Sequence, residues 1–100
     1  MKCYVITNYS IDQNKLEGYA DYPQKASSIT TQFGGRLLVA SLNSQVVEGA
    51  PEDITVVLEF NSRELAERWY SSAEYTAIKN MRINATKAGW MILTDEFTPQ

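Results

Sequence analysis

The sequence predicts one α+β domain in which two helical regions cover one face of a four-stranded antiparallel sheet. The first observation is the alternation of apolar and polar residues along residues 54–60, which is the period of a strand. The second is the helical spacing of apolar residues along residues 61–82, interrupted by a second capping pattern. The third is the length of 100 residues, which suits a single domain spanning residues 1–100 with one core.

The first third of the chain predicts a strand followed by a divided helix. Residues 3–9 carry bulky apolar groups on both faces, which is typical of a strand in the middle of a sheet. Asp12 is expected to cap the helix that follows, and Pro23 is expected to kink or split it because proline lacks a backbone N–H. Gly34 and Gly35 are expected to end the helix, since glycine readily adopts the left-handed conformation.

The middle of the chain predicts a second strand and a long connection. The strand is expected over residues 36–42, with a turn or bulge at Asn43 and Ser44. Residues 45–48 are expected to continue as extended chain. Residues 49–53 are then expected to form a loop, because glycine, proline and aspartate favour turns.

Two capped helices and a final strand are predicted after the third strand. Asn61 with Glu64 is expected to cap the first helix, and Ser71 with Glu74 the second. An apolar run within residues 88–97 predicts the last strand. The resulting order of strand, helix, strand, strand, helix and strand is that of a ferredoxin-like βαββαβ fold.

The predicted sheet is apolar on both of its faces. The helices can cover only one face, yet the first and last strands carry apolar or aromatic residues on both sides. The third strand also places Val57 beside Thr55 and Glu59 on one face. An uncovered apolar face needs a second cover, and the same face of another copy supplies one. We therefore predict a homodimer in which two sheets pack face to face.

Composition limits the class of protein and its partners. Nine Lys and Arg residues against twelve Asp and Glu residues give a net charge of −3, which argues against a nucleic-acid partner. No apolar run reaches the roughly 18 to 20 residues that a membrane span requires, so no membrane partner is expected. No stretch resembles a signal peptide, and a cytoplasmic location is expected. Cys3 is the only cysteine, which excludes an intrachain disulfide.

The lack of histidine in the sequence removes several kinds of active site. A histidine-ligated haem, a Ser-His-Asp or Cys-His arrangement and a zinc site built from histidine and cysteine are all excluded. No glycine-rich nucleotide-binding motif occurs, and Gly34 with Gly35 is expected to end a helix rather than to cradle a phosphate. We therefore expect neither a metal nor a cofactor.

Aromatic residues and two arginines form the candidate binding site, in a cleft between the sheet and the helices. Apolar walls would hold a small planar ligand, and an arginine would hold its carboxylate or enolate. Structural roles are the alternative, because Trp69 and Tyr75 have the spacing of core residues and Arg82 stands near a helix end. The candidate ligand-binding residues are Tyr9, Arg36, Trp69, Tyr70, Tyr75 and Arg82.

Glu59 is the candidate catalytic residue. It lies on a predicted sheet face otherwise formed by Thr55 and Val57, and a dimer that buries this face would bury the carboxylate. Burial raises the pKa of a carboxyl group, which suits a general base that removes a proton next to a carbonyl. The alternatives are solvent exposure at the strand end or an ion pair, in which Arg36 pairs with Glu59 or with Glu48.

Four segments of the sequence resemble one known family. They are YVITNYSI near the start, QFGGRLLV, VVEG, and VVLEFNSRELAERWYSSAEYTAIKNMR. Over residues 2–97 the chain is similar to the domain of unknown function 1330 family, within the dimeric α/β-barrel superfamily, and segments 34–36 and 69–75 are the most specific. The resemblance implies the ferredoxin-like fold and the dimer, and the family has no established activity to transfer. Residues 40–43, ASLN, depart from the basic residue and glycines usual there.

Three functions stay open at this point, and the sequence does not decide whether the protein is an enzyme. The first is binding of a small apolar or aromatic metabolite in the cleft. The second is a cofactor-independent isomerase or monooxygenase acting on such a metabolite, an analogy to related branches of the superfamily at the level of the fold only. The third is a subunit-type interaction protein without a pocket. A titratable group with a shifted pKa inside a real cleft would favour the enzyme.

Overall fold

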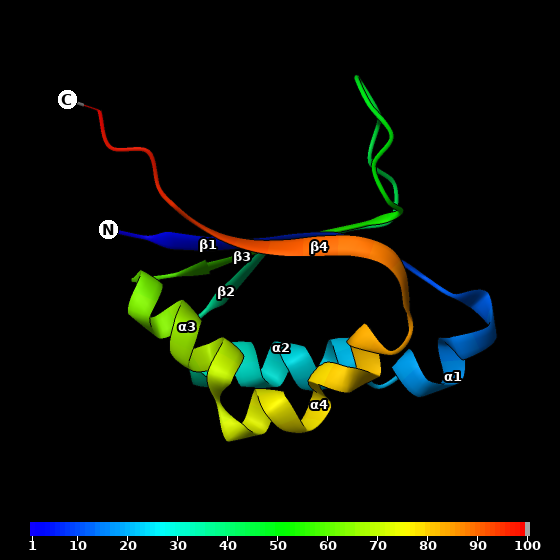
Figure 1. The fold of residues 1–100 in the computed structure, drawn as a ribbon. Coiled ribbons are helices and arrows are strands. Elements are labelled where there is room, and N and C mark those ends of the chain that lie inside the picture. The colour runs from blue at the N-terminus through cyan, green and yellow to red at the C-terminus, as the bar shows by residue number, and fades with distance from the viewer. Residues whose placement is uncertain (100) are drawn as a thin grey trace.

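Within residues 1–99, which the structure describes, four strands and four α-helices form two layers with the helices on one side of the sheet (Figure 1). This computed structural model confirms the predicted α+β class, the antiparallel sheet and the ferredoxin-like order, with strands arranged β2-β3-β1-β4. None of the helices in this range combines the length and apolar character needed to cross a bilayer. The elements are β1 (Cys3–Ile11), the 3-10 helix η1 (Gln13–Lys15), α1 (Leu16–Tyr19), α2 (Tyr22–Gln32), β2 (Arg36–Ser41), β3 (Ile54–Phe60), α3 (Arg63–Ser71), α4 (Ala73–Ile83) and β4 (Thr86–Asp95).

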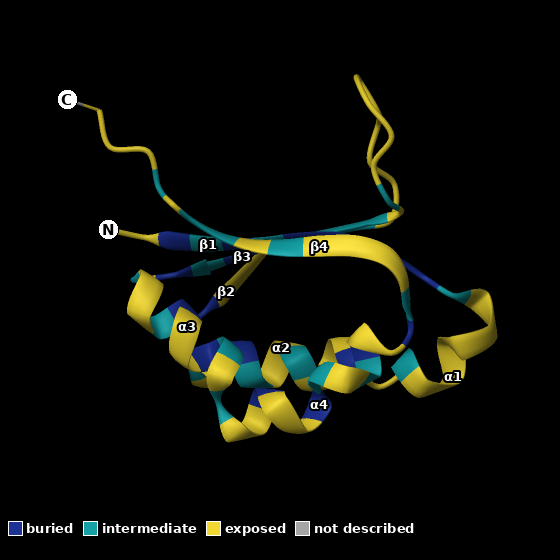
Figure 2. Ribbon diagram, in the orientation of Figure 1, coloured by how far each residue is buried: buried dark blue, intermediate teal, exposed yellow. Residues whose placement is uncertain are grey.

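β1 is a central strand, paired antiparallel with β3 on one side and with β4 on the other. Its residues Cys3 and Val5 are fully buried, together with Phe60 from β3. Trp69 of α3 and Tyr75 of α4 complete the largest buried side chains of the core. Figure 2 shows the buried residues concentrated where the two layers face each other.

Both helix caps lie one residue later than predicted. Ser62, not Asn61, precedes α3, and its hydroxyl accepts a hydrogen bond from the N–H three residues later at 3.2 Å. Ser72, not Ser71, precedes α4 and accepts the equivalent bond at 3.0 Å. The backbone is extended at these two serines, with ψ values of 161° and 154°, whereas Ser71 is still helical. Adjacent residues that can both cap a helix are not distinguished by their types alone.

The helix after β1 is divided, as Pro23 predicts. Asp12 caps only the short η1, where its carboxylate accepts a hydrogen bond from the Asn14 N–H at 2.9 Å. Pro23 stands in the first turn of α2, where the missing N–H needs no partner. Gly34 has a φ of +78° and ends α2, which confirms the expected helix stop.

The edge strand β2 and the connection to β3 differ from the prediction. β2 ends at Ser41, and its bulge lies between Leu37 and Val39 rather than at residues 43–44. Residues 45–48 do not form a strand. They project away from the sheet, so no neighbouring strand pairs with their backbone (Figure 1).

The connection at residues 42–53 rises from the sheet face opposite the helices (Figure 1). Asn8 holds its base, because the Asn8 amide nitrogen donates to the Glu52 and Ile54 carbonyl oxygens at 3.1 and 3.0 Å. The Asn8 side-chain oxygen accepts the Glu52 N–H at 2.7 Å. Residues 96–99 project from the same face (Figure 1). The strand β4 ends at Asp95 and not at the predicted residue 97.

Candidate functional site

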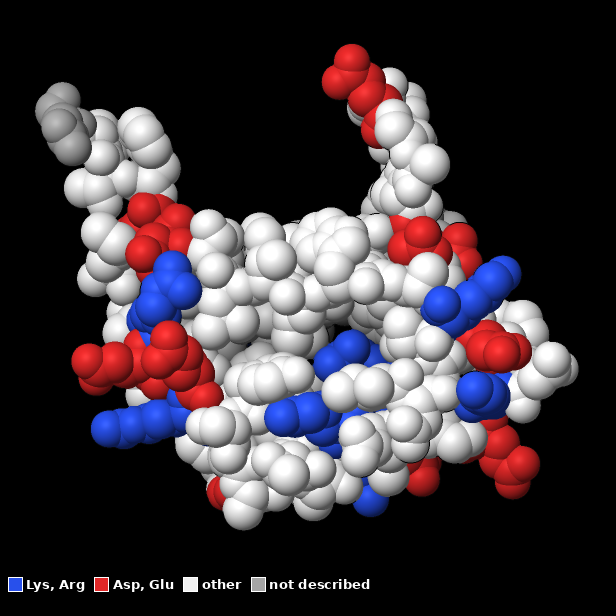
Figure 3. All heavy atoms as spheres, in the orientation of Figure 1, with Lys and Arg blue, Asp and Glu red and all other residues white. Residues whose placement is uncertain are grey.

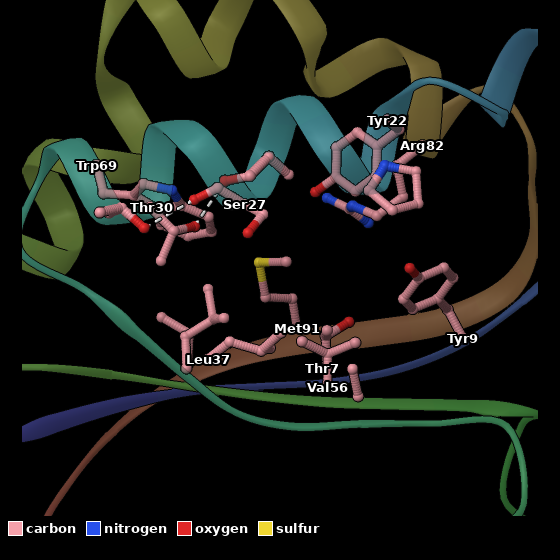
Figure 4. Close-up of a pocket in the computed structure, with 16 residues that line it drawn as sticks. Thr7, Tyr9, Tyr22, Ser27, Thr30, Leu37, Val56, Trp69, Arg82 and Met91 are labelled. Atoms are coloured by element: carbon pink, nitrogen blue, oxygen red, sulfur yellow. Dashed lines mark hydrogen bonds between the residues drawn. The ribbon is translucent and has the colours of Figure 1, made fainter.

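A cavity of about 130 Å³ lies between the sheet and the helices, and most of its wall is apolar. In Figure 4 the lining residues of the sheet lie below this space and those of the helices lie above it. Figure 3 shows the molecular surface hollowed between the two layers, with basic side-chain atoms beside the hollow. The lining residues that decide its chemistry are Thr7, Tyr9, Tyr22, Thr30, Trp69, Arg82 and Met91.

Two periodicities place these side chains. Thr7 and Tyr9 alternate along β1, so both point from the sheet toward the helices. Tyr22, Ala26 and Thr30 follow at intervals of four residues on α2 and therefore share one face of that helix. The hydroxyls of Thr7 and Thr30 already donate to backbone carbonyl oxygens, at 2.7 and 2.8 Å, so neither proton is free for a ligand.

Arg82 is the charged group of the cavity. It stands in the last turn of α4 and is 8% exposed. Its Cζ atom lies 5.9 Å from the ring centroids of Tyr9 and Tyr22, and its Nε is buried without a hydrogen-bond partner. Burial alone would lower the pKa of Arg82, but the hydroxyls of Tyr75 and Tyr22 outweigh it and hold this pKa above its ordinary value. The guanidinium is therefore charged, and the ion pairs found within residues 1–99 do not include it.

Two pairs of tyrosine hydroxyls lie beside Arg82. The hydroxyl oxygens of Tyr9 and Tyr19 are 2.7 Å apart, and the Tyr22 hydroxyl is hydrogen-bonded to that of Tyr75. Burial raises the pKa of Tyr9 and of Tyr22, so both phenols are neutral near pH 7. In each pair one hydroxyl donates to the other, and the second proton is available to a further acceptor.

Trp69 forms the other end of the cavity (Figure 4). It is 1% exposed and packs against the rings of Tyr75 and Phe60, with centroid separations of 4.4 and 5.5 Å. Its indole Nε1 is buried without a hydrogen-bond partner, although a buried tryptophan N–H is usually paired. Trp69 and Arg82, at the two ends of the cavity, therefore each hold a buried N–H donor that has no partner.

Three of the six predicted ligand-binding residues line this cavity, namely Tyr9, Trp69 and Arg82. Tyr75 is fully buried outside its wall. Tyr70 lines a separate surface groove between α3 and β4. The structure thus brings Tyr9, Trp69 and Arg82 around one space and leaves the other two aromatic residues outside it.

Glu59 and Arg36 lie on the sheet face opposite the cavity, because side chains alternate along β3 and its neighbour Leu58 faces the cavity. The Oε1 atom of Glu59 is 3.2 Å from Lys2 Nζ and 3.9 Å from Arg36 Nε. The ion pair given above as the alternative role of both residues is therefore present, with Lys2 as the closer partner. Neither side chain reaches the cavity.

Tyr22 lines the cavity, although it is not among the residues that the sequence predicts for the site. It stands directly before Pro23, and that pair predicts a helix break rather than a site. The signal that could have found it is its spacing of four residues from Ala26 and again from Thr30, which defines one stripe of α2. Met91 was predicted only as part of an apolar strand.

The site suits a compact apolar molecule that carries polar groups at its ends. One charged donor and neutral hydroxyl donors converge in an apolar space, which is the usual composition of a small-molecule pocket. Across the described chain, no three Cys, Asp or Glu side chains are grouped so as to hold a metal ion.

Residues 2–95 match the family model described as a domain of unknown function, DUF1330. The chain belongs to this family. The match confirms the resemblance seen in the sequence and places nearly the whole domain within DUF1330. Comparison with curated proteins gives no match.

Solved structures resemble this DUF1330 chain over nearly its full length. A protein of unknown function from Rhodopseudomonas palustris is 14% identical with a TM-score of 0.77, covering 98% of this chain and 84% of its own. A dimeric protein of unknown function with a ferredoxin-like fold from Bacteroides fragilis is 9% identical with a TM-score of 0.65, covering 95% and 96%. A protein from Nitrosomonas europaea, provisionally named an antibiotic biosynthesis monooxygenase, is 11% identical with a TM-score of 0.68, covering 98% and 92%. At these identities the likeness shows the fold alone.

Proposed function

We propose that this DUF1330 protein binds a compact apolar or aromatic metabolite in the cavity between the sheet and the helices. The observation that carries the proposal is an apolar space of about 130 Å³ that contains the buried Arg82. An engineered protein cavity of about 150 Å³ binds benzene, so a space of this size suits a single ring. The rings of Tyr9, Tyr22 and Trp69 offer walls against which an aromatic ligand can pack. A role as an interaction protein without a pocket is less well supported, because it assigns no purpose to this space.

Thermal unfolding in the presence of single-ring compounds tests the proposal. A ligand at a hundred times its Kd adds about 2.7 kcal/mol to the free energy of unfolding. In a domain of this size that corresponds to a midpoint shift of roughly 10 °C or more. Ala26→Leu fills the cavity and should abolish the shift, whereas Ala73→Leu at the exposed start of α4 should leave it unchanged. A wild-type protein that no compound shifts would contradict the proposal.

A cofactor-independent isomerase or monooxygenase is the second candidate. Arg82 and the neutral tyrosine hydroxyls would stabilise an enolate forming on a bound substrate, and the neighbour from Nitrosomonas europaea carries a provisional monooxygenase name. The cavity groups with a shifted pKa include the phenols of Tyr9 and Tyr22, but their pKa values are raised, so neither phenol is a base near pH 7. The described residues that line the cavity include no carboxylate to act as a base, and Glu59 lies on the other face. Binding therefore ranks first. Mass-spectrometric detection of a converted ligand, lost in Arg82→Gln, would reverse this order.

We also propose that two copies pair through the outer face of the sheet. In the observed register Val39, Val57, Ile6 and Ile92 lie side by side across the four strands. Ile92 is 47% exposed and Trp90, on the same face, is 51% exposed. A continuous apolar surface of this kind is typical of a protein interface. The neighbour from Bacteroides fragilis is dimeric, which supports the pairing of two copies.

Two projecting segments flank the face proposed for pairing. Residues 42–53 and residues 96–99 rise on the same side of the sheet (Figure 1). They carry Leu42, Val47 and Phe97, which are 71%, 85% and 86% exposed. A second copy seated between these segments would remove their apolar side chains from water together with the row on the sheet.

A further inference from the structure

We infer that the ligand is a single-ring carboxylate with a second oxygen acceptor on the far side of the ring, bound by Arg82 at one end and by the Trp69 indole at the other. This inference rests on the proposed binding function and narrows its ligand class. Figure 4 shows the two side chains at opposite ends of the cavity, with Thr7, Val56 and Met91 between them on the sheet side.

Arg82 lacks the anion that a buried guanidinium needs. It is 8% exposed, and its Nε has no hydrogen-bond partner. The three ion pairs present in residues 1–99 join other side chains. A cation out of water without a counter-charge is unfavourable, and the planar guanidinium matches a carboxylate in two parallel hydrogen bonds. A carboxylate entering the cavity would supply both the charge and the acceptors.

The tyrosines beside Arg82 reinforce the choice of an anion. Tyr9 and Tyr22 do not supply negative charge, because burial raises the pKa of both phenols. Their hydroxyls are paired with those of Tyr19 and Tyr75, which leaves one unused proton in each pair. Hydroxyl protons and a guanidinium at one end of an apolar space favour an anionic acceptor over a cation or a hydrocarbon.

Trp69 calls for an acceptor at the opposite end. Its indole nitrogen is a donor only, and its Nε1 is buried without a partner in a side chain that is 1% exposed. The Thr30 hydroxyl, which also lines the cavity, donates to the Ala26 carbonyl oxygen of its own helix and accepts no bond from the indole. A hydroxyl or carbonyl oxygen on the ligand would satisfy the indole N–H.

The volume of the cavity sets the size of the ligand. About 130 Å³ is close to the cavity of about 150 Å³ that binds benzene, so it suits one six-membered ring, with its polar substituents placed at the two ends beside Arg82 and Trp69. The apolar wall formed by Val56 and Met91 faces the body of such a ring. The probe that matches these features is 4-hydroxybenzoate, whose carboxylate and hydroxyl lie on opposite sides of its ring.

Isothermal titration calorimetry at pH 7 with four probes tests the inference. The probes are 4-hydroxybenzoate, 4-hydroxybenzamide, benzoate and benzamide, which vary the charge and the hydroxyl independently. The wild-type protein is expected to bind 4-hydroxybenzoate at least about tenfold more tightly than 4-hydroxybenzamide, because the amide lacks the charge. It is expected to bind 4-hydroxybenzoate at least about threefold more tightly than benzoate, which lacks the hydroxyl. Arg82→Gln should remove the preference for the acid over the amide and keep the preference for the hydroxyl. Trp69→Phe should remove the preference for the hydroxyl and keep the preference for the acid over the amide.

Each preference is the ratio of the affinities of two probes for the same protein. A variant that is merely less stable would bind both probes more weakly and would keep this ratio. Should Arg82→Gln not fold, Arg82→Lys keeps the charge without the planar guanidinium, and a reduced preference for the acid is expected. Equal wild-type affinity for acid and amide would overturn the inference while leaving the binding function intact. Equal affinity for 4-hydroxybenzoate and benzoate would overturn the assignment of Trp69. No heat from any probe, together with no thermal shift from any single-ring compound, would overturn the proposed function itself.

Discussion

At the scale of single residues, the buried phenols of Tyr9 and Tyr22 make the stability of the protein depend on alkaline pH. Burial raises the pKa of both above the ordinary tyrosine value of about 10. Above that ordinary value the unfolded chain loses these protons while the folded chain keeps them. The contribution of each phenol is therefore complete below pH 10, and the free energy of unfolding falls above it by up to about 1.4 kcal/mol per pH unit per tyrosine.

Urea unfolding between pH 8 and pH 11 measures this dependence. Tyr22→Phe removes one of the two titrating groups, so its stability should fall less steeply above pH 10 than that of the wild-type protein. The variant is expected to start from a lower stability at pH 8, because Tyr75 loses its hydroxyl partner. Tyr9→Phe provides a second, independent comparison. Parallel pH profiles of the wild-type protein and both variants would argue against this effect.

Gly35 is a residue at which no side chain fits. A Cβ atom there would lie 2.7 Å from the Phe60 ring and from Thr30 Cγ2, and Phe60 is fully buried and unable to move aside. Gly35→Ala is therefore expected to lower the free energy of unfolding by about 1 to 3 kcal/mol, measured by urea unfolding. Gly18→Ala is the matched control, since nothing lies within 4 Å of its added Cβ. In the control, stability should be unchanged or should rise by about 0.5 to 1 kcal/mol; equal losses in both variants would refute the packing argument.

At the scale of elements, the serines at the junction of α3 and α4 differ in role although they are neighbours. The Ser72 hydroxyl oxygen accepts the Tyr75 N–H at 3.0 Å, whereas the exposed Ser71 hydroxyl donates back to the Glu67 carbonyl oxygen. Ser72→Ala should destabilise the protein by about 1 kcal/mol through loss of the cap. Ser71→Ala should change it by less than about 0.5 kcal/mol. Thermal unfolding of both variants measures the difference. A larger loss of stability for Ser71→Ala than for Ser72→Ala would mean that Ser71 is the cap, as the sequence predicts.

Local sequence patterns predict the presence of the helices and strands more accurately than the residues at which these elements begin and end. The strand at residues 54–60 has the predicted bounds, because alternation along a strand is a local property of the sequence. The caps lie one residue later than predicted because neighbouring residues such as Asn61 and Ser62 can both serve, and only the backbone geometry shows that Ser62 does. Residues 45–48 have strand-like composition but lack a neighbouring strand, which only the assembled sheet reveals.

At the scale of the whole molecule, the packing of the two layers decides which candidate residues share a site. Tyr9 and Arg82 were predictable because a central strand and the helix facing it both point inward. The position of Tyr22 in the cavity was not predictable, because it depends on the packing of α2 against α4, where the Tyr22 hydroxyl is hydrogen-bonded to that of Tyr75. Glu59 was correctly placed on the face of Thr55 and Val57, but only the finished sheet shows that this face is turned away from the cavity.

The outer face of the sheet leads to the prediction for the assembled molecule. Ile92 lies in the apolar row of that face and is 47% exposed, so Ile92→Glu would place two charges in a face-to-face dimer while leaving each domain folded. Sedimentation velocity should give about twice the chain mass of 11.3 kDa for the wild-type protein and a single chain for the variant. Ile83→Glu is the control, because Ile83 is 42% exposed but belongs to α4 in the opposite layer, and it should stay dimeric. Two outcomes would contradict pairing through this face: a wild-type protein that sediments as a single chain at high concentration, or an Ile92→Glu protein that remains dimeric. The exposed apolar row would then be available to a partner other than a second copy.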